Sequence, residues 1–127
     1  MRDRPQLLVV DDDIAIRDVV SIALEGEGFR VVTADDGRSG LRLLARGLRP
    51  DCILLDLRMP EVDGFEFRRS QLAHAEIAGI PVVAFTGAAD PDAAAQARRL
   101  GIRGLLQKPV DLGALLYALV DAIGLKA

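Results

Sequence analysis

Five short apolar runs recur along the 127-residue chain, and they constrain its fold more than any other feature of the sequence. Each is about five residues long, rich in Val, Ile and Leu, and continuous rather than alternating: QLLVV (6–10), RVVTA (30–34), DCILL (51–55), IPVVAF (80–85) and RGLLQ (103–107). Continuous apolar runs of this length are typical of parallel strands that are covered on both faces. We therefore predict five buried parallel strands.

A segment with a helical pattern follows each run. We predict helices over 13–26, about 37–47, about 64–75, 89–101 and 111–124. The last segment repeats apolar side chains at the spacing of one helix face, and its predicted buried stripe is Leu112, Leu115, Leu116, Leu119, Val120 and Ile123. Asp111 is suited to cap its start and Gly124 to end it.

The segment 89–101 differs from the other predicted helices in how little it can bury. Asp90 is its expected N-cap, Pro91 its expected first helical residue, and Leu100 its only large apolar side chain. We expect it to be the most loosely held helix.

A strand followed by a helix, repeated five times, predicts an α/β fold with helices on both faces of an open parallel sheet. The length fits one domain, 1–127, with a core over about 6–124. The only cysteine, Cys52, cannot form an internal disulfide, and its apolar neighbours predict a buried, unreactive side chain.

Charge and hydropathy argue against two kinds of partner. The net charge is -3 and the sixteen Lys and Arg residues are scattered, so we expect no direct binding to nucleic acid. The longest uncharged stretch, 77–89, contains Pro81 and is shorter than the roughly 20 residues of a membrane helix. The charged start MRDRPQ lacks the apolar core of a signal peptide, so a cytoplasmic protein is expected.

Polar side chains gather where the predicted strands end. The first strand runs into Asp11 and Asp12, the third into Asp56, the fourth into Thr86, and the fifth into Lys108. Ligands of open parallel sheets bind at the carboxyl ends of the strands. Three carboxylates, one hydroxyl and one ammonium are therefore expected to meet in one cleft.

Oxygen ligands of this kind suit Mg²⁺, or the similar Mn²⁺. A carboxylate can also form an acyl phosphate, and Asp56 is well placed to do so at the end of the central strand. Asp13 is most simply the N-cap of the helix over 13–26. His74 lies in a polar segment, and we expect it to have an ordinary surface role.

Four separated motifs, VVDDD, DCILLDLRMPEVDG, VVAFTG and LLQKPV, resemble in order and spacing the CheY-like receiver domains of bacterial two-component response regulators. The resemblance covers nearly the whole chain. It implies a flavodoxin-like sheet of order 2-1-3-4-5. It also implies that Asp56 accepts a phosphoryl group from a sensor histidine kinase or a phosphotransfer protein.

The resemblance also implies individual roles at the metal site. Mg²⁺ would be held by Asp12, Asp56 and the backbone carbonyl of Arg58, with Asp11 acting mainly through water. We hypothesise in addition that the Arg58 side chain folds over the phosphoryl group and changes its lifetime.

Further roles are implied for the fourth and fifth strand ends. Thr86 would donate to one phosphoryl oxygen and Lys108 would neutralise another, with the Lys108–Pro109 peptide bond in the cis form. The family commonly has an aromatic residue three positions before this lysine. Here that residue is Leu105, so any switch works through Thr86 and Leu105 or through the loosely held helix.

The implied function is a switch rather than an enzyme, catalysing only its own phosphorylation and dephosphorylation. The switching surface would comprise the segments 89–101, 103–107 and 111–124, which would contact a downstream partner or output domain, or a second copy in a homodimer. The chain stops shortly after the last predicted helix. A stand-alone regulator, part of a hybrid kinase and a piece of a larger regulator all stay open.

Other readings of the same residues stay open as well. A degenerate receiver would only bind proteins, although the complete acidic, Thr and Lys set argues against it. A small Asp-dependent phosphatase would need a second acid two residues after the nucleophile, where the chain has Arg58. A flavodoxin-like or other nucleotide-binding module is disfavoured because VVDDD replaces a phosphate loop and no GxxxxGK[ST] pattern occurs.

Overall fold

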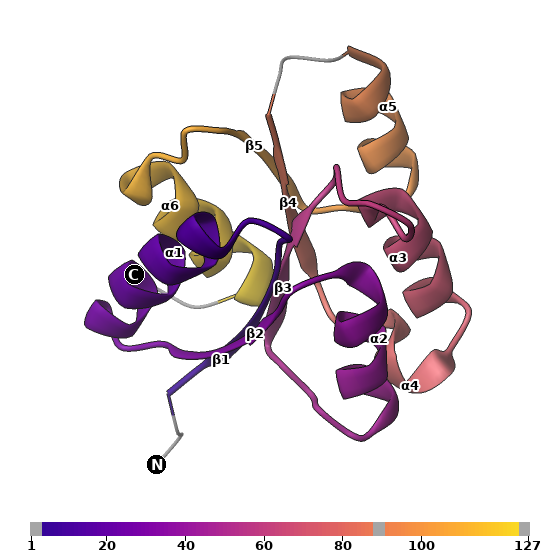
Figure 1. Ribbon diagram of the computed structural model, residues 1–127, viewed down its shortest axis with the longest axis horizontal. Coiled ribbons are helices and arrows are strands. Elements are labelled where there is room, and N and C mark those ends of the chain that lie inside the picture. Colours follow the sequence, from indigo (N-terminus) through magenta and orange to yellow (C-terminus); the bar gives the residue numbers. More distant parts are fainter. Residues whose placement is uncertain (1–3, 88–90, 125–127) are drawn as a thin grey trace.

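Five parallel strands form a single sheet in the order β2-β1-β3-β4-β5 (Figure 1). The computed structural model describes residues 4–87 and 91–124. The strands are β1 (Gln6–Val10), β2 (Arg30–Ala34), β3 (Cys52–Asp56), β4 (Val82–Thr86) and β5 (Gly104–Gln107). The predicted strands and their order are confirmed, and β3 and β4 each extend one residue beyond the predicted end, to Asp56 and Thr86.

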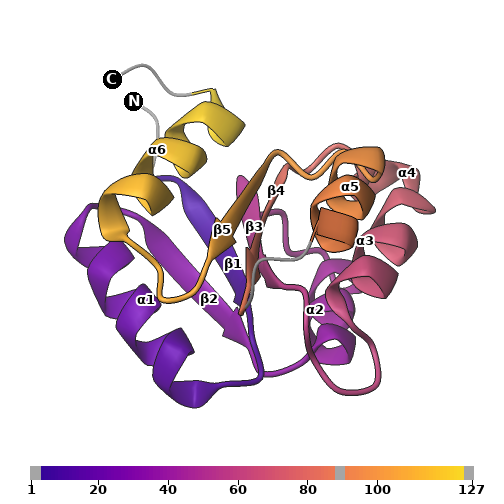
Figure 2. The same cartoon turned by 90° about the horizontal axis from the view of Figure 1, so that it is seen from above.

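Helices cover both faces of the sheet, as predicted (Figures 1 and 2). They are α1 (Ile14–Gly26), α2 (Gly37–Ala45), α3 (Gly64–Leu72), α4 (Ala75–Ala78), α5 (Pro91–Arg99) and α6 (Leu112–Ile123). The helices α1 and α6 lie on one face, and the other four lie on the opposite face (Figure 2). No helix in the described part of the chain is long and apolar enough to span a membrane.

The short helix α4 was not predicted. The helix expected over 64–75 ends at Leu72, and the chain forms a separate turn over Ala75–Ala78. The buried Gln71 amide explains this break, because its Nε2 donates to the backbone oxygens of Ile77 at 2.8 Å and Ile80 at 2.9 Å. These bonds hold the following turn against α3, and no local propensity in the sequence indicates them.

Aspartates begin four of the helices, in agreement with the preference of helix starts for short side-chain acceptors. They are Asp13 before α1, Asp36 before α2, Asp63 before α3 and Asp111 before α6. The predicted capping roles of Asp13 and Asp111 are confirmed. At the other end of α6, Gly124 adopts a left-handed conformation with φ of 80° and ends the helix as predicted.

The core has two main layers, one on each face of the sheet, because successive strand residues point to opposite faces. Leu7 and Val9 of β1 pack with α1 and α6, whereas Leu8 and Val10 pack on the side of α2 and α3. Most of the predicted α6 stripe is buried or partly buried. Leu112, the first residue of the helix, is the exception and is 39% exposed.

Helix α5 buries little side-chain surface. Ala93 and Ala97 are its buried residues, and Leu100 follows the helix and is only partly buried. The predicted cap Asp90 lies outside the described residues. The expectation of a lightly anchored helix is in keeping with these contacts, since two alanines bury far less apolar area than two leucines.

Candidate functional site

The carboxyl ends of the strands bring the predicted polar residues together. Asp11 is fully buried, and Asp56 and Thr86 are 3% and 5% exposed. Asp12 is exposed. Carboxylate oxygens of Asp11, Asp12 and Asp56 all lie within 4.8 Å of one another. Three carboxylates this close repel one another strongly unless a cation lies among them.

Lys108 supplies one cation to this cluster. Its Nζ lies 3.0 Å from Asp11 Oδ2 and 3.4 Å from Asp56 Oδ2. The Lys108–Pro109 peptide is cis as expected, and the Lys108 amide donates to the Thr86 carbonyl at 2.8 Å. Burial alone would lower the pKa of Lys108, but the hydrogen bond to Asp11 and the charges of both carboxylates raise it overall.

Asp56 is the most perturbed acid of the site. Burial raises its pKa from 3.8 to about 6, and the charge of Asp11 adds to this effect. The Arg58 amide, which donates to Asp56 Oδ1 at 3.1 Å, and the Lys108 ammonium act in the opposite direction. The cluster combines three carboxylates with one ammonium, so its oxygen donors fit a further hard cation such as Mg²⁺.

Gly64 allows the loop after β3 to return closely to Asp56. A Cβ on Gly64 would lie 2.7 Å from the Asp56 carbonyl oxygen and 2.7 Å from Leu57 Cα. The Gly64 amide donates to the Leu57 carbonyl at 3.1 Å. The glycine thus serves the start of α3 and the backbone that presents Asp56, which is a structural role.

Thr86 and Leu105 lie on neighbouring strands at the α5 side of the site. Thr86 ends β4, and Leu105 of β5 is in register with Ala84. Leu105 is partly buried against a small cluster that includes Ala93 of α5. A hollow of about 390 Å³ next to Thr86 is bordered by the exposed Arg58 and by α5 residues. The residues predicted to switch therefore lie beside the lightly anchored helix.

Arg17 belongs to the surroundings of the site and was missed from the sequence. Its Nη1 donates to the Asp11 backbone oxygen at 2.7 Å, which fixes the chain at the end of β1. The only available signal was its position near the start of the helix that follows the acidic triplet.

Two other residues lie apart from the site, as expected. Cys52 is buried, and burial raises the pKa of its thiol to about 12. His74 is exposed.

Comparisons with known proteins agree with this geometry. The family described as "Response regulator receiver domain" matches residues 7–120. The transcriptional regulatory protein GlrR of Escherichia coli is 41% identical over 119 residues, which are 92% of this chain and 26% of that protein. The regulator RpaA of Synechocystis is 41% identical over 85% of this chain and 44% of its own length. The chain thus spans less than half of either relative.

Solved structures give the same result. The chemotaxis protein CheY4 of Vibrio cholerae superposes with a TM-score of 0.86 at 34% identity, covering 94% of this chain and 98% of CheY4. A response regulator receiver protein of Pseudomonas putida gives a TM-score of 0.88 at 31% identity, covering 95% and 99% of the two chains.

Proposed function

Since this chain belongs to the family of response regulator receiver domains, we propose that it accepts a phosphoryl group on Asp56 in a reaction that needs Mg²⁺ or Mn²⁺. The donor would be a sensor histidine kinase or a phosphotransfer protein. One observation carries the proposal: a buried carboxylate at the end of the central strand lies between two further carboxylates and a lysine.

In the proposed transfer, an Asp56 oxygen attacks the phosphorus atom of a phosphohistidine. The P–N bond breaks as the P–O bond to Asp56 forms, and the ring leaves as neutral imidazole because its other nitrogen already carries a proton in the phosphohistidine. Asp11, Asp12, Asp56 and the Arg58 carbonyl would hold the cation, which neutralises charge on the phosphoryl oxygens. Since Asp11 already accepts from Lys108 and from the Asp13 amide, its contact with the cation would be through water.

Lys108 and Thr86 would hold the transferred group. The ammonium lies 3.4 Å from Asp56 Oδ2, where it can neutralise one phosphoryl oxygen. The Thr86 hydroxyl would donate to another. A movement of Thr86 toward the phosphoryl group would reach α5, because Thr86 and Ala93 line the same hollow and Ala93 packs in one cluster with Leu105.

The proposed output is a change in the surface formed by α5, β5 and α6, which are the segments expected to switch. A downstream protein, an output domain or a second copy of the chain would bind there. The chain would catalyse only its own phosphorylation and dephosphorylation.

Incubation with acetyl phosphate and Mg²⁺ tests the proposal directly. We expect the intact mass to increase by one phosphoryl group, and we expect no increase when the metal is chelated. Beryllofluoride with Mg²⁺ should shift the amide NMR signals of Thr86 and Leu105. An unchanged mass and spectrum, also with a cognate kinase, would favour a degenerate receiver that only binds proteins.

Arg58 is proposed to lengthen the lifetime of the phosphorylated state. Its exposed side chain borders the hollow beside Thr86, two residues after Asp56, and the guanidinium would fold over the phosphoryl group. Arg58→Ala should therefore speed dephosphorylation about two- to fivefold, as expected for one solvent-exposed ionic contact. The decay of phosphoprotein after removal of the donor measures this rate. Arg99→Ala on α5 is the control, and equal rates in both variants would contradict the hypothesis.

The phosphodonor is proposed to dock on α1. Val19 and Ile22 are 68% and 72% exposed there, an unusual amount for apolar side chains one turn apart. A groove of about 290 Å³ between α1 and α6 includes Val19 and Pro109, and so adjoins the loop that carries Lys108. A protein bound there would be close enough to present a phosphohistidine to Asp56.

Val19→Asp separates docking from chemistry. We expect phosphotransfer from the cognate kinase to slow about tenfold, because a charge replaces an apolar side chain that the bound kinase would bury. Phosphorylation by acetyl phosphate should not change, because that donor needs no protein surface. Leu72→Asp makes the same kind of change on α3, at a residue 40% exposed, and should leave both reactions unchanged. Equal loss with both donors would argue against docking on α1.

A further inference from the structure

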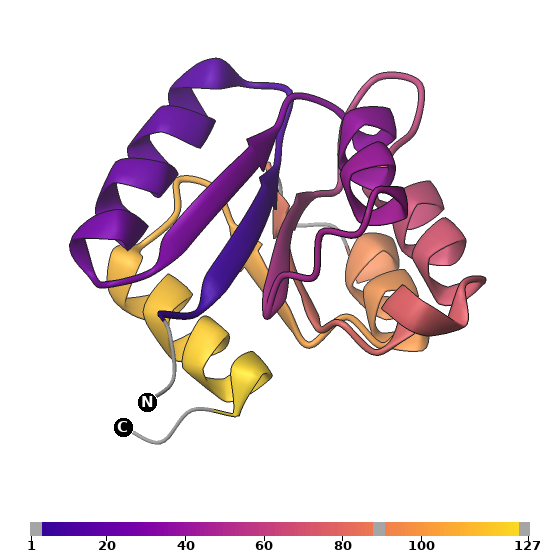
Figure 3. The ribbon, with the colours of Figure 1, turned by 90° about the horizontal axis from the view of Figure 1, so that it is seen from below.

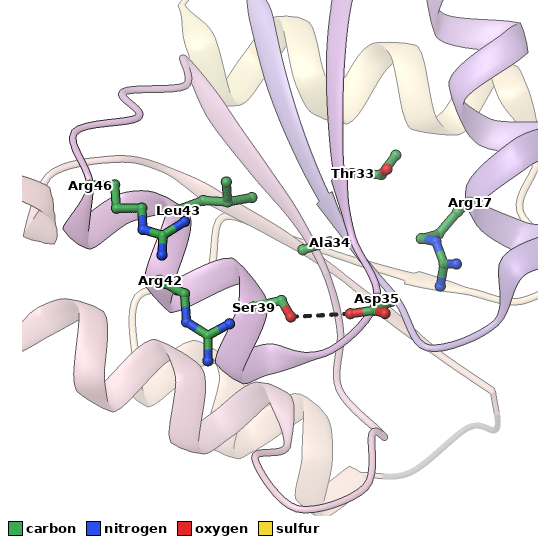
Figure 4. A pocket seen from close by; sticks show the side chains of 8 residues that line it. All are labelled: Arg17, Thr33, Ala34, Asp35, Ser39, Arg42, Leu43 and Arg46. Carbon is green, nitrogen blue, oxygen red and sulfur yellow. Dashed lines mark hydrogen bonds between the residues drawn. The ribbon is translucent and has the colours of Figure 1, made fainter.

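Another hollow lies at the β2 edge of the sheet, outside the acidic cluster, and Arg17 borders both. Its volume is about 410 Å³, and its lining is Arg17, Thr33, Ala34, Asp35, Ser39, Arg42, Leu43 and Arg46 (Figure 4). Figure 3 shows β2 at this edge, with α1 and α2 to its two sides. The volume lies within the roughly 300–1,000 Å³ of small-molecule sites.

Positive charge dominates this hollow in a chain whose net charge is -3. Arg42 of α2 and Arg46, which directly follows that helix, lie one turn apart, and Arg17 of α1 lies on the other side of Asp35 (Figure 4). Within residues 4–87 and 91–124, neither Arg42 nor Arg46 forms an ion pair with a carboxylate. Planar guanidinium groups recognise phosphate through paired hydrogen bonds. The hollow therefore fits a ligand with a phosphate group.

Asp35 narrows the chemistry of this ligand. It follows β2 directly, and its Oδ1 accepts from the Ser39 hydroxyl at 3.1 Å (Figure 4). A carboxylate would weaken binding of a bare anion, but it can accept from the hydroxyls of a sugar. A carboxylate that follows a strand of a parallel sheet recognises ribose in this way in dinucleotide-binding folds. The ligand should thus carry hydroxyls as well as phosphate.

We propose that this hollow binds a nucleoside diphosphate. The phosphates lie on Arg42 and Arg46, the ribose hydroxyls donate to Asp35, and the rest of the molecule packs against Leu43. Arg17 contributes its remaining donors, because one of its nitrogens is already used by the Asp11 carbonyl. The proposal is independent of phosphorylation, so binding should persist in the Asp56→Asn variant.

Titration with ADP in the absence of divalent metal tests the proposal by calorimetry and by NMR. We expect saturable binding, with shifted amide signals at Thr33, Asp35 and Ser39. Arg42→Gln combined with Arg46→Gln should lower the affinity about tenfold or more. Arg98→Gln combined with Arg99→Gln removes the same charge from α5 and should leave the affinity unchanged.

Pyrophosphate and ribose 5-phosphate distinguish a nucleotide site from simpler binding. The Asp35→Asn variant should bind ADP and ribose 5-phosphate more weakly than the wild type does. Its affinity for pyrophosphate should be unchanged. If pyrophosphate binds as tightly as ADP and Asp35→Asn changes neither, the hollow holds an adventitious ion only. The proposal is also overturned if ADP shifts signals around Lys108 instead, or if only an extended acidic peptide binds, through the free edge of β2.

Discussion

Asp56→Asn is expected to abolish phosphoryl incorporation from both acetyl phosphate and a cognate kinase. Asparagine keeps the shape of the side chain and can still accept from the Arg58 amide, but its amide is not a nucleophile that can form an acyl phosphate. Intact-mass measurement after incubation with each donor checks the result. Asp12→Asn is the matched control, because it removes a carboxylate from the same cluster but leaves the acceptor.

The Asp12→Asn variant should incorporate the phosphoryl group more slowly than the wild type. At long incubation times or high Mg²⁺ concentration it should still become phosphorylated. Continued incorporation by the Asp56→Asn variant would show that another carboxylate is the acceptor. Complete loss in both variants would leave the acceptor unidentified by mass alone. Fragmentation of the wild-type phosphoprotein after reduction of the acyl phosphate would then have to locate the modification at Asp56 for the prediction to stand.

The same substitution should stabilise the metal-free protein at neutral pH, which excludes unfolding as the cause of lost activity. Burial raises the pKa of Asp56 to about 6, so the folded state binds a proton more tightly than the unfolded state does. The destabilisation by Asp56 therefore grows as pH rises from about 4 to about 6 and is complete above that. The Asp56→Asn variant should therefore gain roughly 3 kcal/mol in free energy of unfolding at neutral pH and almost nothing below about pH 4. Urea unfolding with a chelator measures both values, and an equal gain at the two pH values would contradict this cause.

The strands and the gathering of polar side chains at their carboxyl ends could be predicted because their signals are local. A run such as DCILLD contains both the buried strand and the acid that ends it, and parallel order places Asp11, Asp56 and Lys108 at one edge. Capping aspartates such as Asp13 are likewise recognised from neighbouring residues. The architecture therefore follows from short stretches of sequence that each act on their own.

Long-range polar contacts were not predictable in this way. Arg68 lies on a helix where a charged residue suggests a solvent-exposed face, yet it is only 6% exposed. Its Nε donates to the Leu100 carbonyl at 2.9 Å and its Nη2 to the Gly101 carbonyl at 3.4 Å, more than thirty residues away. No periodicity or motif connects these positions.

The hydrogen bonds of Arg68 anchor one end of α5, so the helix is not loosely held along its whole length. The helix buries two alanines along its length, but the backbone that follows it is fixed to α3 by the Arg68 guanidinium. We therefore expect α5 to move about its C-terminal end, with the larger displacement at the end closer to Thr86. A single buried cation would then set which part of the proposed switch surface can respond to phosphorylation.

Arg68→Ala is expected to lower the free energy of unfolding by about 3 kcal/mol or more, because it leaves several backbone carbonyls and the Gln71 amide oxygen without their donor. Burial lowers the pKa of Arg68, and its hydrogen-bond partners among the described residues are all neutral oxygens, so hydrogen bonding rather than ion pairing accounts for its contribution. Urea unfolding measures the loss. Arg69→Ala, at the exposed neighbouring position, should cost less than about 0.5 kcal/mol.

Arg68→Met separates packing from hydrogen bonding at this position. Methionine keeps an apolar stem of similar length but donates nothing, so most of the loss should remain if the carbonyl contacts are responsible. Phosphorylation by acetyl phosphate should survive in any variant that folds, since Arg68 does not contact the acidic cluster, whereas amide exchange in Leu100, Gly101 and the end of α5 should accelerate. Arg68 does not anchor α5 if Arg68→Met is as stable as Arg69→Ala. The same conclusion follows if amide exchange at Leu100 and Gly101 is unchanged in Arg68→Met.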